Sequence, residues 1–374
     1  KGGTSMRGSV RKRGSGWEYT VDMGKDPLTN KRLRKSKSGF RTKKECEAAL
    51  AEIITKLDKG EYFEASDMNL KEYLIYWLDI YKSKIAPSTL QRYQEYSNYA
   101  IKHIGNIKLE KLKPINLQKL YVKLEETLTS GTVLKVHRML HLALKHAVNW
   151  QMINSNPADA VTAPKANKTE MKVWSPEISA KFMNGIRGTT AFLPVMLALT
   201  TGMRRGEISA LKWSNVNFKD GFISITHNMQ RVDGNHYELK PPKTDKSART
   251  IAMMDITIKE LKEHRKKQLE IKLLMGYEYK DENFVCAWED GRPYTPHYIS
   301  DIFRKYVLKL DFPKIRFHDL RHTHATMLLS KGVHPKVVSE RLGHSTINIT
   351  LDTYSHVLPN MQKEAVKKLN VLFD

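Results

Sequence analysis

A segment in the second half of the chain carries an arginine that is suited to bind a phosphate group. Arg204 lies within Thr201–Glu207, directly after the apolar run Leu193–Leu199 and before a predicted helix. The start of a helix favours an anion, because its unpaired backbone N–H groups and its dipole direct positive charge toward the ligand. A guanidinium there can hold a phosphate through two parallel hydrogen bonds. Alternatively, Arg204 is a surface residue that pairs with Glu207.

A second cationic pair follows at His318 and Arg321. Residues three apart on a helix are neighbours, so the imidazole and the guanidinium are expected to project together toward one anion. His322 and His324 follow closely, which raises a zinc site as an alternative. The stretch lacks the histidine pair with an intervening glutamate that zinc hydrolases use, and Arg321 would repel a cation. The sequence therefore predicts a metal-free site.

Two more residues complete the candidate site. His344 follows Leu342 and Gly343, and the glycine is expected to end a helix. Tyr354 comes ten residues later and is one of 16 tyrosines in the chain. A single tyrosine in an amphipathic stretch usually serves packing, so Tyr354 gains meaning only from the motifs that precede it.

These motifs, in this order, resemble the tyrosine recombinase (phage integrase) family, and in particular the integrases of conjugative transposons and temperate phages. The resemblance covers residues 172–374. It implies that two arginines clamp the scissile phosphate, that two histidines contact it, and that a tyrosine is the nucleophile. By position these are Arg204, Arg321, His318, His344 and Tyr354, with Glu207 as the acidic residue near the first arginine. The resemblance also implies a lysine in a β-hairpin, for which Lys243 is preferred over Lys240 and Lys246.

The implied reaction is site-specific DNA recombination for a mobile genetic element. Charge grows on the phosphate oxygens during attack, and arginine and histidine donors can stabilise it without a metal. His318 is the candidate base for the phenol proton, because histidine titrates near neutral pH. Lys243 is the candidate acid for the leaving 5′ oxygen. The resulting 3′-phosphotyrosine keeps the energy of the phosphodiester, so neither ATP nor a cofactor is expected.

The resemblance further implies a homotetramer on two paired duplexes that reacts through a Holliday junction. Ala365, Leu369, Leu372 and Phe373 form a stripe on a predicted terminal helix. This helix is expected to dock either on its own domain or on a neighbouring protomer. An excisionase or a host DNA-bending protein is an expected partner.

Two other functions remain open. A type IB topoisomerase uses similar chemistry but relaxes DNA as a monomer. A non-catalytic regulator would use residues 330–350 as a helix-turn-helix, with Gly332 in the turn. The second alternative leaves the arginines, His318 and Tyr354 without a role.

Composition agrees with a DNA-binding protein of several domains. The chain has 374 residues, 40% of them hydrophobic, and a formal net charge of +23, which favours a polyanionic partner. Only Cys46 and Cys286 are present, so neither a disulfide framework nor a cysteine zinc site is expected. There is no apolar run of membrane length and no signal peptide, which predicts a cytoplasmic, nucleoid-associated protein. Residues 1–5, ahead of Met6, are interpreted as a cloning remnant.

The elements that position the site fall into three predicted domains, in a multidomain, predominantly α fold with small β elements. Residues 6–64 are expected to form an antiparallel sheet backed by one helix, which opens with a capping box at Thr42. By resemblance this is the domain that binds arm-type DNA sites, and its sheet is expected to enter the major groove. The candidate DNA-binding residues are Arg11, Lys12, Arg13, Arg32, Arg34, Lys35 and Lys37.

The remaining chain is expected to hold two further domains. Residues 68–162 predict a bundle of short helices, which by resemblance binds the core site. Residues 163–171 read as a linker, and residues 172–374 as a mixed, mainly α catalytic domain with a strand-rich interruption from Gly221 to Ile251.

Overall fold

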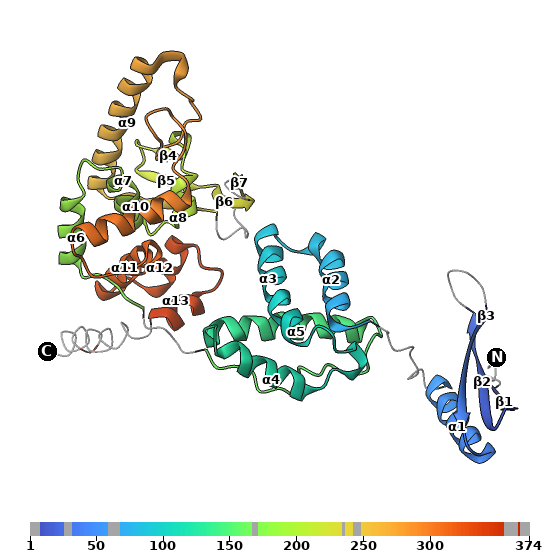
Figure 1. Cartoon of the computed structure of the whole chain (residues 1–374). Helices are drawn as coiled ribbons and strands as arrows, with labels where there is room; N and C mark the ends of the chain where they lie inside the picture. Colours follow the sequence, from blue (N-terminus) through green and yellow to red (C-terminus); the bar gives the residue numbers. More distant parts are fainter. Residues whose placement is uncertain are drawn as a thin grey trace. The chain divides into compact units, whose positions relative to one another are not determined.

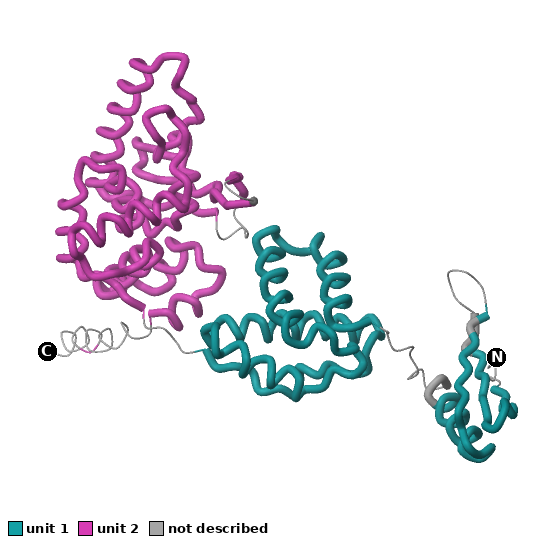
Figure 2. Tube along the Cα trace, in the orientation of Figure 1, with its two compact units in different colours: residues 1–168 teal, residues 169–374 magenta. Residues whose placement is uncertain are grey.

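The computed structural model describes residues 8–25, 32–58, 68–166, 171–233, 236–241, 248–354 and 366. It divides into two compact units, residues 1–168 and residues 169–374, which are drawn in different colours in Figure 2. The fold is predominantly helical with small antiparallel sheets, as the sequence predicts. Within the described ranges, no helix is both long enough and apolar enough to cross a membrane.

The first unit begins with a three-stranded antiparallel sheet that is backed by one helix (Figure 1). Its elements are β1 (Gly8–Arg13), β2 (Gly16–Lys25), β3 (Arg32–Phe40) and α1 (Lys43–Asp58). Tyr19 and Val21 alternate along β2 and are buried against Cys46 and Leu50 of the helix. The predicted capping box is confirmed, since the Thr42 hydroxyl accepts from the backbone N–H of Glu45 at 3.2 Å.

The second part of this unit is a bundle of four α-helices. They are α2 (Leu70–Tyr81), α3 (Pro87–Ile104), α4 (Pro114–Glu125) and α5 (Ser130–Asn149). Pro87 and Pro114 occupy the first turn of their helices, where a missing N–H costs nothing. Leu70, Leu74 and Trp77 form an apolar stripe along α2 and are fully buried. Short 3-10 turns adjoin these helices at Lys82–Lys84 and Leu109–Lys111.

The second unit is built around one large apolar core. Its helices are α6 (Pro176–Gly185), α7 (Phe192–Thr201), α8 (Arg205–Ser209), α9 (Asp255–Met275), α10 (Pro296–Lys309), α11 (Phe317–Ser330), α12 (Pro335–Leu342) and α13 (Ile347–Tyr354), with 3-10 turns at Trp213–Asn215 and Gly276–Glu278. The predicted strand-rich interruption is present as a sheet in the order β4-β5-β8 and a separate hairpin of β6 and β7. These strands are β4 (Val216–Asn217), β5 (Phe222–Ile225), β6 (Asn228–Asp233), β7 (His236–Lys240) and β8 (Arg249–Ala252).

A small second cluster in this unit holds the last helices in place. Ala325 and Leu329 of α11 pack with Val338 and Leu342 of α12 and with Tyr354 at the end of α13. Helix α11 also packs along α7, whose C-terminal end leads directly to Arg204. The fold therefore gathers the C-terminal ends of α7, α12 and α13 around α11.

Candidate active site and DNA-binding surface

One open pocket of about 370 Å³ collects most of the predicted site residues. The described residues that line it are Arg204, His318, Arg321, His322, Gly343, His344, Ser345, Ile349 and Thr353. Four residues that the sequence places as much as 140 positions apart therefore face one cavity. Its walls carry two guanidinium groups and three imidazoles, a composition suited to a phosphate.

Arg204 reaches the pocket from the start of α8. The chain leaves α7 through Gly202, whose positive φ of 70° turns it sharply toward α8. A side chain at Gly202 would place its Cβ 2.7 Å from the His324 ring, so only glycine fits this turn. Arg204 is the N-cap of α8 and donates to the Glu207 carboxylate at 2.8 Å, while its other Nη donates to Gly343 O at 3.3 Å. Arg204 therefore both pairs with Glu207 and lines the pocket, so the two alternatives drawn from the sequence hold together.

Arg321 and His318 come from the first two turns of α11. Arg321 is 2% exposed and donates through its two Nη atoms to Gly202 O at 2.7 Å and to Leu342 O at 2.5 Å. Burial, together with Arg204 and Arg249, lowers the pKa of Arg321 to about 9, so the guanidinium stays charged at neutral pH. These contacts fix its remaining N–H groups at the pocket wall.

The two predicted histidines are neutral at pH 7. His318 lines the pocket and is partly exposed to solvent. Partial desolvation of its ring lowers its pKa, and the nearby His322 and Arg321 act in the same direction, so that this pKa is about 4. Burial and the same arginine lower the pKa of His344 to about 3. The ring of His344 is oriented by a 2.8 Å hydrogen bond between Nδ1 and the Thr350 hydroxyl. Neutral rings can accept a proton or donate an N–H to a phosphate oxygen.

Tyr354 lies behind the pocket wall and is fully buried. It is not among the described residues that line the cavity, although the adjacent Thr353 is. Burial raises the pKa of Tyr354 to about 12, and Arg321 opposes this shift. A phenol in this environment is a poor nucleophile until a neighbour takes its proton.

His322 is the neighbour that contacts the hydroxyl of Tyr354, whereas from the sequence it was a candidate only for a zinc ligand. Its Nδ1 and the hydroxyl are 2.8 Å apart, and its pKa is lowered by burial. His318 reaches His322 edge-on, with ring centroids 5.1 Å apart. The spacing of His318, Arg321 and His322 places all three on one helical face, and this signal could have identified His322 as well.

The three candidates for the hairpin lysine lie at and beyond the end of β7. Lys243 and Lys246 both lie outside the described residues, so the preference for Lys243 stays a prediction. Lys240 ends β7 and pairs with Glu238 at 3.4 Å.

His324 lies behind the pocket and links α11 to α7 and α12. Its Nδ1 lies 2.8 Å from Leu199 O, and its Nε2 accepts from Arg341 Nε at 3.1 Å, which fixes the neutral ring. Within the described ranges, no three His, Cys, Asp or Glu side chains gather in a way that can hold a metal ion.

The buried His324 predicts a stability that depends on pH. Burial and Arg341 lower its pKa to about 4 in the folded chain, whereas the unfolded value is near 6.5. Between these values the unfolded chain binds the extra proton, so stability falls as the pH drops from 6.5 to 4, by at most about 1.4 kcal/mol per pH unit. Melting temperatures of wild type should therefore fall more steeply over this range than those of His324→Gln. Equal slopes would contradict this expectation.

The predicted DNA-binding residues of the first unit lie on two faces of its sheet. Cross-strand partners share a face, so the pairs Arg11↔Glu18 and Arg34↔Asp22 lie on the open face, away from α1. Arg13 lies there too, since it donates to Glu18 at 2.9 Å. In contrast, Lys12, Lys35 and Lys37 are in register with the helix-backed residues Trp17, Val21 and Tyr19. Arg32 is exposed and pairs with Lys25 beyond a bulge.

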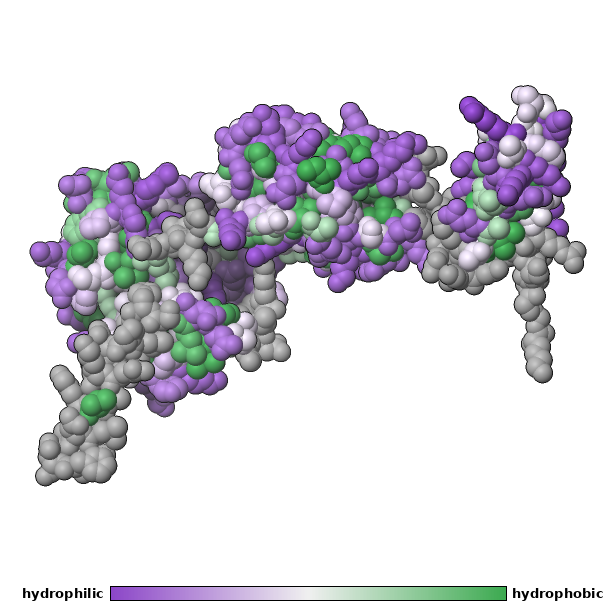
Figure 3. Space-filling model, turned by 90° about the horizontal axis from the view of Figure 1, so that it is seen from below, coloured by the Kyte–Doolittle hydropathy of each residue, from purple (hydrophilic) through white to green (hydrophobic). Residues whose placement is uncertain are grey.

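The open face is organised by one carboxylate. Glu18 is 3% exposed because Arg11 and Arg13 both cover it with 2.9 Å ion pairs. The hydrogen bond from Arg11 holds the pKa of Glu18 below its usual value. Thr20 and Ser36 continue the same face with a 2.8 Å hydrogen bond. On the side of the molecule that Figure 3 shows, hydrophilic residues predominate over the parts drawn in colour.

Comparison with known proteins finds a family model for each of three parts of the chain. The model of the phage integrase family matches residues 177–361, an arm DNA-binding domain model matches residues 9–57, and a phage integrase N-terminal SAM-like domain model matches residues 69–124. A protein named tyrosine recombinase XerC-like from Caldanaerobacter subterraneus is 32% identical over 384 residues, which cover 96% of this chain and 97% of that protein. The ICEBs1 integrase of Bacillus subtilis is 29% identical and covers 97% of this chain and 100% of its own length.

Solved structures show the same fold. The Tn1549 transposon integrase in complex with transposon right end DNA matches with a TM-score of 0.71 at 21% identity, covering 81% of this chain and 100% of that one. A lambda integrase tetramer bound to a Holliday junction matches with a TM-score of 0.58 at 17% identity, covering 92% and 94%. The full-length similarity to curated relatives, together with the pocket that joins the arginine and histidine motifs, shows that this chain belongs to the phage integrase family of tyrosine recombinases.

Proposed function

We propose that this protein integrates and excises a mobile genetic element by cutting and rejoining DNA through Tyr354. The observation that supports the proposal best is the shared pocket of Arg204, Arg321, His318 and His344. The hydroxyl of Tyr354 lies behind its wall, in contact with the lining residue His322. In this proposal the scissile phosphate occupies the pocket. The two guanidinium groups bind its non-bridging oxygens, and His344 donates a hydrogen bond to one of them.

The chemical step follows from the charges of the site. The Tyr354 oxygen attacks phosphorus, a 3′-phosphotyrosine bond forms, and the bond to the 5′ oxygen breaks. Negative charge grows on the phosphate during this step and is stabilised by fixed arginine donors, so the reaction needs neither a metal nor ATP. The phosphotyrosine conserves the phosphodiester energy, and attack by the 5′-hydroxyl of a partner strand releases the tyrosine.

Two histidines are candidates to accept the proton of Tyr354. His318 is the sequence-based prediction, and its lowered pKa makes it a neutral acceptor at pH 7. His322 is also neutral and contacts the hydroxyl directly. The proton for the leaving 5′ oxygen comes from the hairpin lysine, for which Lys243 remains preferred.

Recombination by this chemistry requires four cleavages, so we propose a tetramer on two paired core sites that proceeds through a Holliday junction. The lambda integrase relative was solved as such a tetramer. The terminal stripe of Ala365, Leu369, Leu372 and Phe373 lies outside the described residues, and its docking stays a prediction. An excisionase or a host DNA-bending protein is the proposed accessory partner.

The proposed domain roles divide DNA binding along the chain. Residues 6–64 bind arm-type sites, residues 68–162 bind the core site, residues 163–171 link them to the catalytic domain, and residues 172–374 carry the catalysis. Full-length similarity to a protein named tyrosine recombinase XerC-like and to the ICEBs1 integrase favours this division over a topoisomerase. The helix-turn-helix alternative is disfavoured, because α12 and α13 form the pocket wall that holds His344 and Tyr354.

A nicked duplex from the ends of the element tests the proposal. The nick lets the short cleaved strand diffuse away, so the covalent intermediate accumulates. Wild-type protein is expected to give a protein–DNA adduct on a denaturing gel, in EDTA and without ATP. A requirement for added metal or ATP, or relaxation of any supercoiled DNA without site preference, would contradict the proposal.

The open face of the N-terminal sheet predicts which cations bind the arm-type site. Arg34→Ala should weaken binding of a fluorescent duplex from the element's end by about tenfold. The salt dependence of binding should also show that about one counterion fewer is released. Lys12→Ala removes a cation of equal charge from the helix-backed face and serves as the matched control, with binding expected near wild type. Equal losses for the two variants would indicate that charge alone, rather than the open face, governs binding.

A further inference from the structure

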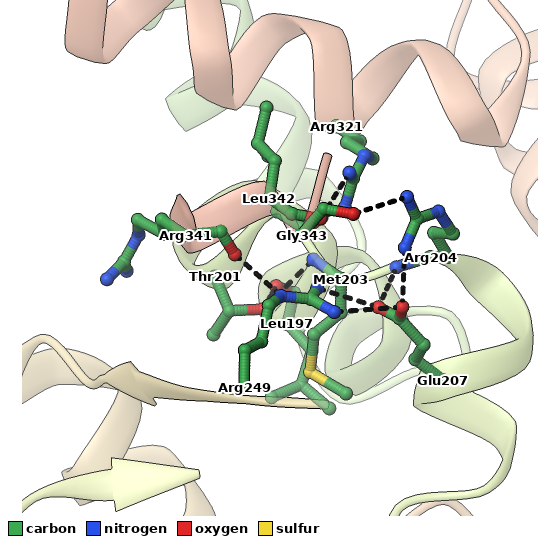
Figure 4. Close-up of polar contacts among 11 residues, drawn as sticks. Leu197, Thr201, Met203, Arg204, Glu207, Arg249, Arg321, Arg341, Leu342 and Gly343 are labelled. Carbon is green, nitrogen blue, oxygen red and sulfur yellow. Dashed lines mark hydrogen bonds and ion pairs between the residues drawn. The ribbon is translucent and has the colours of Figure 1, made fainter. Parts of the chain in front are cut away.

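The C-terminal end of α12 is held by three arginines from three different elements. The consecutive carbonyl oxygens of Arg341, Leu342 and Gly343 accept from Arg249, Arg321 and Arg204, at 2.7, 2.5 and 3.3 Å (Figure 4). The last carbonyls of a helix have no partner within the helix and carry its negative dipole, so cations there are stabilising. The next residue along the chain is His344, whose position depends on this end.

Arg249, at the start of β8, is the one of these three that does not line the pocket among the described residues. Its side chain is 6% exposed. Its Nε donates to Arg341 O, and its two Nη atoms donate to the two oxygens of Glu207 at 3.0 and 2.9 Å. Its guanidinium therefore connects β8, the turn that carries Arg204 and the end of α12.

The aliphatic part of Arg249 also contacts this end of α12. Gly343 has a positive φ of 66°, and a Cβ built on it would lie 3.0 Å from Cδ of Arg249. The glycine and the arginine are thus packed against each other, and a side chain at position 343 would displace the guanidinium. This contact is independent of the hydrogen bonds.

Glu207 is shared between Arg249 and Arg204. Oε1 of Glu207 accepts from one Nη atom of Arg249 and, at 2.8 Å, from the side chain of Arg204. Oε2 accepts from the other Nη atom of Arg249 and, also at 2.8 Å, from the backbone N–H of Arg204. Despite its burial, the hydrogen bonds and charges of the two arginines lower the pKa of Glu207 to about 2, so it is ionised. Without Arg249, the carboxylate of Glu207 would pair with Arg204 alone. Its negative charge would then weaken the attraction between Arg204 and a phosphate.

We propose that Arg249 is a positioning residue of the phosphate site. It balances Glu207 so that Arg204 keeps its charge for the phosphate, and it anchors the α12 end so that His344 faces the pocket. This inference rests on the proposed function, because it assigns Arg249 a part in strand cleavage. It requires no contact between Arg249 and DNA.

The test measures the single-turnover cleavage rate on the nicked duplex at saturating protein. Arg249→Met keeps the apolar stem and removes every donor, and it should slow cleavage by about 10²-fold through misplacement of the site. The dissociation constant for the same duplex should stay within about threefold of wild type. Arg249→Lys keeps the charge but cannot make three directed contacts, and it provides a milder variant if Arg249→Met folds poorly.

A double variant separates positioning from simple destabilisation. Glu207→Gln in the Arg249→Met background removes the uncompensated carboxylate, so cleavage by folded protein should recover at least severalfold over Arg249→Met alone. Arg187→Met is the matched control, since Arg187 pairs with the nearly buried Glu260 at 2.8 Å and does not line the pocket among the described residues. Its cleavage should match wild type.

The outcomes distinguish this inference from the function on which it rests. Wild-type protein that forms no adduct would contradict the proposed function itself. If wild type forms the adduct and folded Arg249→Lys and Arg249→Met cleave as fast as wild type, only the role of Arg249 is overturned. A double variant that is no faster than Arg249→Met would likewise overturn the balancing of Glu207.

Discussion

Tyr354→Phe is expected to abolish the covalent adduct while leaving the protein folded and able to bind DNA. Phenylalanine keeps the ring that packs with Leu329 and Leu342 but lacks the oxygen that attacks phosphorus. Loss of the hydrogen bond to His322 should lower the free energy of unfolding by only about 1 kcal/mol. The nicked duplex and a denaturing gel provide the measurement, with the binding of intact duplex measured in parallel.

Tyr121→Phe is a closely matched control for this substitution. Tyr121 is also buried, and its hydroxyl lies 3.0 Å from Nδ1 of His137, so the variant loses a hydrogen bond of the same kind in the helical bundle. It should form the adduct at the wild-type rate. An adduct that persists in Tyr354→Phe would show that another residue is the nucleophile.

Arg204→Ala is expected to slow strand cleavage by about 10²- to 10³-fold, the usual cost of removing one donor to a developing negative charge. Binding of intact duplex should weaken far less, because many other cations of the protein contact the backbone. Arg204 is a better subject than Arg321, since its side chain is 35% exposed while Arg321 supports Gly202 and Leu342 from within the core. The measurement compares cleavage rate and dissociation constant for the same duplex.

The neighbouring Arg205 supplies the control for charge. Arg205→Ala removes an exposed guanidinium that donates to the Ser300 hydroxyl at 2.9 Å and does not line the pocket among the described residues. Its cleavage rate should stay near wild type. Equal losses of binding and cleavage in Arg204→Ala would instead indicate that Arg204 only anchors the DNA backbone.

The helix end at Gly343 and the helical face that His318 and Arg321 share were both predicted from the sequence. Glycine marks the sharp turns at positions 202 and 343, and both adopt a positive φ that other residues rarely take. The periodicity of α11 correctly placed His318 and Arg321 together. These features are local, so a few neighbouring residues determine them.

The contacts between distant segments were not predictable in the same way. Arg249 begins the short strand β8, whose sequence gives no sign of a contact with Glu207 or with the end of α12. The burial of Tyr354 and its contact with His322 also depend on how α13 packs against α11. Strand β1 could not be placed from the sequence, because its basic residues lack the alternation of apolar side chains that is present in β2.

The most direct test of the account identifies the amino acid that becomes attached to DNA. The adduct from wild-type protein and the nicked duplex is digested with protease and nuclease, and the remaining nucleotide-bearing peptide is sequenced by tandem mass spectrometry. One modified peptide is expected, in which a nucleotide is joined by its 3′ phosphate to Tyr354. A nucleotide on any other residue, or a linkage through a 5′ phosphate, would contradict it.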